Sequence, residues 1–163
     1  MKIDTIVEAA LNEQIKHEFE SAYAYLSLAT DLGATPYNGF AHWMKKQYEE
    51  ELEHAMRIYK YIQERQGRVK LQSFECPNYN VQSPLEAFQI AYKLEVENTE
   101  RIHKAFALAV QQKDYPTEIF LQWFIKEQVE EENDCQTMID ALELAKDCSS
   151  VLLTLDRKAA QRQ

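Results

Sequence analysis

Apolar residues recur at helical spacing through four long stretches of the chain, and short clusters of glycine, proline and polar residues separate these stretches. The pattern predicts four helices over about residues 4–32, 37–66, 84–112 and 115–146, and a short fifth helix over about 150–160. Ser83 and Pro84 are typical of a helix N-terminus, and Asp114 is the expected cap of the fourth helix. Only three glycines and four prolines occur, too few for the frequent turns of an all-β fold. We therefore predict an all-α protein.

The connections between the predicted helices set their arrangement. The first and third connections are short, so each joins an antiparallel pair. A helix of about 30 residues is about 45 Å long, and about 14 extended residues can span that length. The long second connection, residues 67–83, can therefore leave the second and third helices parallel. We predict a four-helix bundle with one long crossover over residues 1–146, followed by a short C-terminal helix and tail over residues 147–163.

Each of the four long helices carries a glutamate in the middle of its apolar stripe, where an apolar residue would be expected. His54 lies one turn from one of these glutamates, and Glu127 lies one turn before another. A buried carboxylate without a partner costs several kcal/mol, and no lysine or arginine lies centrally beside them. Such carboxylates with one imidazole suit two bridged iron ions, with manganese or zinc as competitors. The four glutamates are Glu18, Glu51, Glu95 and Glu131.

Other interpretations of the same residues are open at this point. One glutamate in an apolar stripe usually reaches solvent or forms an ion pair, and the whole chain could be a purely structural bundle. Another di-metal carboxylate enzyme without storage, an oxygenase or a rubrerythrin-like peroxidase, is the second alternative. The large side chains Phe88, Phe106 and Phe124 disfavour an oxygenase pocket, and the chain has no CxxC pair for a rubrerythrin iron domain.

Composition limits which classes of partner, and which cellular compartment, we expect for the protein. A net charge of −9 disfavours nucleic acid, because phosphate binding needs a basic surface. No apolar run approaches the ~18 residues of a membrane span, and residues 1–10 do not resemble a signal peptide. Cys76, Cys135 and Cys148 are widely spaced, which fits reduced thiols better than disulfides. We expect a cytoplasmic protein with no nucleic-acid and no membrane partner.

Several stretches of the chain together match one known family. They are Leu11-Asn-Glu-Gln, Glu18 with Tyr25, Gly39-Phe-Ala-His-Trp-Met-Lys-Lys, Glu50-Glu-Leu-Glu-His54, Tyr92-Lys-Leu-Glu95, Phe120-Leu-Gln-Trp and Glu127-Gln-Val-Glu-Glu-Glu132. The chain resembles the prokaryotic non-haem ferritins over essentially its full length. This resemblance implies a ferritin-like bundle that oxidises Fe(II) with dioxygen or peroxide and stores Fe(III) mineral. It also implies a homo-oligomeric shell of 24 subunits, with the short fifth helix at the fourfold axis.

The resemblance further implies a di-iron ferroxidase centre inside each subunit. Glu18, Glu51 and His54 would hold the first iron. Glu51, Glu95 and Glu131 would hold the second iron, so that Glu51 bridges the two. These five residues are the predicted core of the site.

Additional residues receive roles from the resemblance alone. Gln128 would form a hydrogen bond near the second iron, and Tyr25 matches a tyrosine placed to donate an electron. A third iron site would use Glu50, Glu127, Glu130 and Glu131.

Two departures from related proteins refine these expectations. Haem-binding relatives carry a second Glu-x-x-His on the fourth helix, where this chain has Glu127 and Glu130. They also carry a haem-ligating methionine after the bridging glutamate, where this chain has Leu52. We therefore expect no haem. At the threefold channel, Glu118 matches one acidic position but Leu121 occupies the second, which argues against a strongly acidic path for iron uptake.

Overall fold

The computed structural model describes residues 1–163 and contains five helices and no strand. The helices are α1 (Thr5–Gly33), α2 (Asn38–Glu64), α3 (Pro84–Gln111), α4 (Tyr115–Ala145) and α5 (Ser149–Ala159). The predicted all-α class is confirmed, and each predicted helix boundary lies within two residues of the observed one. None of the five helices combines the length and the apolarity needed to cross a membrane.

Side chains cap the helices at the predicted positions. Ser83 Oγ accepts a hydrogen bond from the Glu86 backbone N–H at 3.2 Å, and Pro84 occupies the first turn of α3. Asp114 Oδ1 accepts from the Thr117 N–H at 3.3 Å at the start of α4. Each bond satisfies one N–H group that the first helical turn leaves without a backbone partner.

The end of α2 differs from the prediction. The helix ends at Glu64, and Gln66 takes the left-handed conformation with φ of 56°. The glycine that follows, Gly67, has no positive φ and serves close packing instead. A Cβ atom on Gly67 would lie 2.8 Å from atoms of Ile3, Glu8 and Ile62. Gly67 therefore lets the chain leave α2 in contact with the N-terminal segment.

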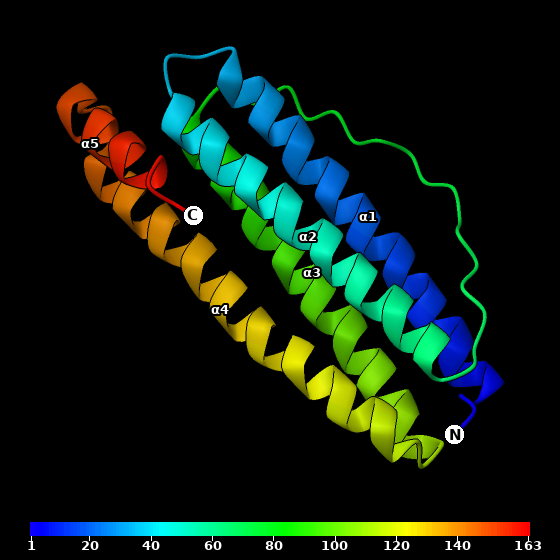
Figure 1. The fold of residues 1–163 in the computed structure, drawn as a ribbon. Coiled ribbons are helices and arrows are strands. Elements are labelled where there is room, and N and C mark those ends of the chain that lie inside the picture. Colours follow the sequence, from blue (N-terminus) through cyan, green and yellow to red (C-terminus); the bar gives the residue numbers. More distant parts are fainter.

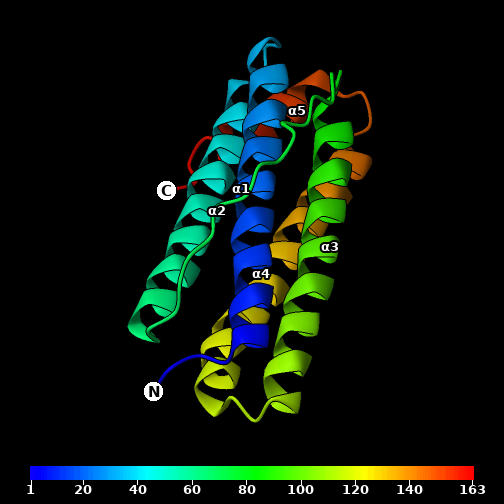
Figure 2. The same ribbon diagram turned by 90° about the vertical axis from the view of Figure 1, so that its right-hand side faces the viewer.

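The long connection between α2 and α3 runs beside α1 along the bundle, which leaves α2 and α3 parallel (Figures 1 and 2). Side chains of α1 hold it in place: Asn12 Oδ1 accepts from the Lys70 N–H at 2.6 Å, and Asp31 Oδ2 accepts from the Val81 N–H at 3.0 Å. These bonds give the extended backbone the partners that a sheet would otherwise supply. The predicted crossover is thus present.

Two apolar clusters fill the bundle, one toward each end. The cluster nearer α5 includes Tyr25, Phe40 and Phe88. The cluster at the other end includes Ile58 and Phe124. Fully burying one such side chain contributes roughly 1.5–3 kcal/mol, so the two clusters hold the four helices together on both sides of a polar middle section. That middle section contains the buried glutamates.

Candidate metal centre

The five predicted core ligands meet in the polar middle of the bundle, one or two from each helix. Exposure of these residues is 0% for Glu18, 1% for Glu51, 5% for His54, 1% for Glu95 and 6% for Glu131. Acidic side chains are almost never so buried unless they are paired or bind a metal. The bundle therefore concentrates carboxylates where they carry a cost that a cation would remove.

Glu18, Glu51 and His54 form a trio with unused ligand atoms. His54 Nδ1 lies 3.8 Å from Glu18 Oε2 and 3.9 Å from Glu51 Oε2. These separations are too long for hydrogen bonds, and none of the three atoms has another partner. A cation that binds N and O ligands at about 2.0–2.2 Å fits between atoms spaced in this way. The trio can therefore hold one metal ion.

Glu95 and Glu131 complete the opposite side of the site. The Tyr25 hydroxyl donates a hydrogen bond to Glu95 Oε1. Gln128 Nε2 donates to Glu95 Oε2 at 3.1 Å. Gln47 Nε2 donates to Glu131 Oε2 at 2.6 Å. Buried donors thus fix the orientation of both carboxylates, as is common around metal ligands.

Burial and mutual repulsion shift the pKa values of these acids. Burial raises the pKa of Glu51 well above its usual range, and the nearby Glu95 and Glu18 raise it further. Burial also raises the pKa of Glu95, although the bonds from Tyr25 and Gln128 act against it. The four carboxyl groups cannot all be ionised in this small buried space unless a cation neutralises them.

The pKa values of Glu131, Glu18 and His54 are shifted as well. Burial raises the pKa of Glu131 to about 8, and repulsion from Glu95 and Glu50 acts in the same direction. Burial opposes ionisation of Glu18 too, but the contact with His54 outweighs it and lowers the pKa of Glu18. Burial would likewise lower the pKa of His54, yet Glu18 raises it above its ordinary value. Without metal, the surroundings thus favour the charged forms of Glu18 and His54 and the protonated forms of Glu51, Glu95 and Glu131.

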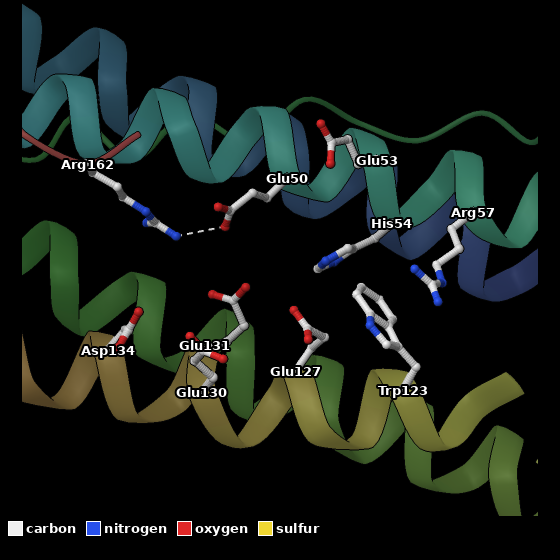
Figure 3. A pocket seen from close by; sticks show the side chains of 10 residues that line it. All are labelled: Glu50, Glu53, His54, Arg57, Trp123, Glu127, Glu130, Glu131, Asp134 and Arg162. Atoms are coloured by element: carbon white, nitrogen blue, oxygen red, sulfur yellow. Dashed lines mark hydrogen bonds and ion pairs between the residues drawn. The ribbon is translucent and has the colours of Figure 1, made fainter. Parts of the chain in front are cut away.

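An acidic cavity of about 370 Å³ opens beside this core (Figure 3). Glu127 and Glu131 project into it from α4, and their ligand atoms lie within 4.8 Å of an imidazole nitrogen of His54. Glu50 lines it from α2, and the exposed Glu130 lines it from α4. The cavity therefore joins the buried core to the residues expected for a third metal.

Several polar residues of the centre were not singled out in the sequence. Gln14 Nε2 donates to Glu18 Oε1 at 2.7 Å and to Asn98 Oδ1 at 2.7 Å. Gln14 precedes Glu18 by four residues, and Gln47 precedes Glu51 by four. In these two cases, a glutamine one helical turn before a glutamate of the apolar stripe was the signal that could have identified the residue. Arg162, which also lines the cavity, had no such signal.

Comparison with known proteins shows which family the chain resembles. A family model described as "Ferritin-like domain" matches residues 8–145. The chain is 36% identical over 153 residues to the bacterial non-heme ferritin of Staphylococcus aureus strain USA300, covering 94% of this chain and 92% of that protein. The Staphylococcus haemolyticus protein of the same name is equally similar.

Solved structures are also similar over the full chain. An engineered closed form of the Archaeoglobus fulgidus ferritin is 42% identical with a TM-score of 0.97, covering 99% of each chain. The open pore ferritin of that archaeon is 43% identical with a TM-score of 0.96, covering 99% of this chain and 98% of that one. The chain therefore belongs to the ferritin family, among its prokaryotic non-haem members.

Proposed function

We propose that this protein stores iron and has ferroxidase activity. It would take up Fe(II), oxidise it with dioxygen or peroxide inside each subunit, and retain Fe(III) as a mineral within an oligomeric shell. The observation that carries the proposal is the set of buried ligand atoms without partners on Glu18, Glu51 and His54. Membership in the ferritin family and the names of the relatives support iron as the substrate.

The residue assignment follows the two sides of the centre. Glu18, Glu51 and His54 would hold the first iron, and Glu51, Glu95 and Glu131 the second. The bridging role of Glu51 is supported by its two oxygens, neither of which has a hydrogen-bond donor. A bridging carboxylate needs both oxygens for metal, whereas Glu18 and Glu131 each have one oxygen held by a glutamine.

The chemistry follows from the donor atoms and the charge of the site. Hard carboxylate oxygens favour Fe(III) over Fe(II), which makes oxidation easier. Two adjacent Fe(II) ions can each lose one electron, and dioxygen would take both electrons with two protons to give hydrogen peroxide. Raised pKa values at Glu51, Glu95 and Glu131 mean that these carboxyls would release protons as iron binds. Iron uptake and proton release would therefore be coupled in the same cavity.

Residues around the core receive supporting roles in this proposal. Gln128 would orient Glu95, and Tyr25 would supply an electron across its hydrogen bond to the same carboxylate. A third iron would bind at Glu50, Glu127 and Glu130, with Glu131 shared. The acidic cavity supports this outer site because it opens directly onto His54 and Glu131.

The shell is proposed as a cytoplasmic homo-oligomer of 24 subunits without haem. Large apolar side chains exposed on α1, α2, the crossover and α5 are available for contacts between subunits. They include Ile6, Tyr23, Met56, Leu71, Val151 and Leu153.

Iron loading would test storage and separate it from a storage-free peroxidase. The purified apo-protein would receive Fe(II) in air at two and then about fifty ions per subunit. Iron and protein would then be measured in the same size-exclusion fractions. We expect iron far beyond three ions per subunit to elute with a large assembly. Retention of only two or three ions per subunit would contradict storage and leave only a di-metal enzyme.

A further inference from the structure

The C-terminal tail is fixed against the start of α2. Asp156 Oδ1 on α5 accepts a hydrogen bond from the Phe40 backbone N–H at 2.9 Å. A Cβ atom on Gly39 would lie 1.8 Å from the carbonyl oxygen of Asp156, so α5 and α2 are in backbone contact here. Glycine is required for this approach. The residues after α5 therefore begin from a defined point beside α2.

Arg162 extends this contact along α2 toward the metal centre. Its backbone carbonyl accepts from His42 Nε2 at 2.8 Å, and its guanidinium carbon lies 4.2 Å from the Trp43 ring centroid. Its Nη2 then lies 2.7 Å from Glu50 Oε2. The Arg162 side chain is 17% exposed and the Glu50 side chain 37%, so the guanidinium is largely shielded from water while the carboxylate remains accessible. Figure 3 shows the guanidinium directed from the tail into the acidic cavity.

Arg162 is the one cation that pairs with an acid of this cavity. Six acidic residues and two arginines line the space. The other arginine, Arg57, lies over the Trp123 ring at 3.8 Å and makes no ion pair with these acids. Arg162 Nη1 is buried without a hydrogen-bond partner. One guanidinium nitrogen of Arg162 thus neutralises Glu50, while another remains without a partner.

We propose that Arg162 is a tethered counter-cation of the outer metal site, which a third metal ion must displace in order to bind Glu50. The inference rests on the proposed function, because it takes Glu50 to be a ligand of that site. Guanidinium stays charged at all relevant pH values, so it leaves Glu50 only by moving. The tail would therefore weaken the third metal site selectively, while the buried core ligands, which Arg162 does not contact, keep their affinity.

Zinc provides a redox-inert probe of this arrangement. Binding of Zn²⁺ to the apo-assembly would be measured by equilibrium dialysis for the wild type, Arg162→Gln and Arg157→Gln. Arg157 is an exposed arginine on α5 and serves as the control for loss of one positive charge. We expect the third Zn²⁺ per subunit to bind about tenfold more tightly to Arg162→Gln. The first two should bind equally in all three proteins.

The outcomes separate this inference from the proposed function. Equal affinity for the third Zn²⁺ in the wild type and Arg162→Gln, or no third Zn²⁺ in either, would overturn the role of Arg162. An equal gain in Arg157→Gln would also overturn it, because a general charge effect would then suffice. Failure of all three proteins to bind the first two ions would instead contradict the di-metal centre.

Tryptophan fluorescence offers a second readout of tail movement. Trp43 and Trp123 are the two tryptophans of the chain, so Trp123→Phe leaves Trp43 as the reporter beside Arg162. In this background, the third equivalent of Zn²⁺ should change the Trp43 emission as the guanidinium leaves the ring. The same addition to Trp123→Phe/Arg162→Gln should produce no such change. A matching response in both proteins would show that the signal does not come from Arg162.

Discussion

Gln47 on α2 donates a 2.6 Å hydrogen bond to one oxygen of Glu131 on α4, across the middle of the bundle. Gln14 holds one oxygen of Glu18 in the same way at 2.7 Å. Glu51, which lies near both of these acids, has no donor on either oxygen. Because Gln14 and Gln47 each occupy an oxygen of a neighbouring acid, Glu51 is the carboxylate best suited to contact two metal ions at once.

Replacing Glu51 should have the largest effect on iron oxidation. Glu51→Ala removes one ligand from each proposed iron, so the fast phase at two Fe(II) per subunit should disappear. The apo-protein should fold and become more stable, because alanine favours helix and a buried acid is lost. Stopped-flow absorbance and thermal unfolding would measure the two effects. Glu64→Ala, at an exposed position of the same helix, is the control, and a wild-type rate in Glu51→Ala would refute the bridging role.

Metal-free stability should depend on pH through Glu131. Its pKa is raised to about 8 by burial and by repulsion from Glu95 and Glu50, so folding favours the protonated form. The penalty is absent below the ordinary pKa of a glutamate and grows as pH rises toward 8. Metal-free Glu131→Gln avoids this penalty. Its melting temperature, measured by calorimetry, should rise relative to the wild type between pH 5 and pH 8. A constant difference across that range would contradict the shifted pKa.

The outer acids should behave differently from the core ligands. Glu130→Ala and Glu50→Ala leave the five core residues in place, so the first oxidation phase should match the wild type. Later turnovers and the ratio of iron oxidised to oxygen consumed should change, because the third site is lost. Stopped-flow traces paired with an oxygen electrode would decide. Collapse of the first phase would show that core and outer sites are not separate, and wild-type behaviour throughout would show that these acids hold no functional metal.

The stability of the fold should depend on an ion pair between Arg65, at the end of α2, and Asp114, at the start of α4. Arg65 Nη1 lies 2.9 Å from Asp114 Oδ1, and the same carboxylate caps α4. Asp114→Ala removes the cap and leaves a buried guanidinium unpaired, which should cost about 2–4 kcal/mol. Asp4→Ala removes only the cap of α1 and should cost about 1 kcal/mol. Equal losses in unfolding experiments on the two variants would argue against a contribution from the ion pair.

Local pattern was sufficient to predict most of this fold. Helical periodicity, the caps at Ser83 and Asp114, and the length of the crossover were all visible in the chain. A glutamate such as Glu51 was conspicuous because it interrupts an apolar stripe. The contact of Arg162 with Glu50 could not be predicted, because the two residues are 112 positions apart. No helical repeat in the sequence relates one position to the other. The role of Gly67 was also hidden, since close packing with Ile3 leaves no local signal.

Anomalous diffraction would test the di-iron centre most directly. Crystals of the assembly would be soaked with Fe(II) under anaerobic conditions, and data would be collected on both sides of the iron absorption edge. We predict two peaks in each subunit, one between Glu18, Glu51 and His54 and one between Glu51, Glu95 and Glu131. Iron peaks that avoid Glu51, or iron found only on the surface of the subunit, would contradict the proposed centre.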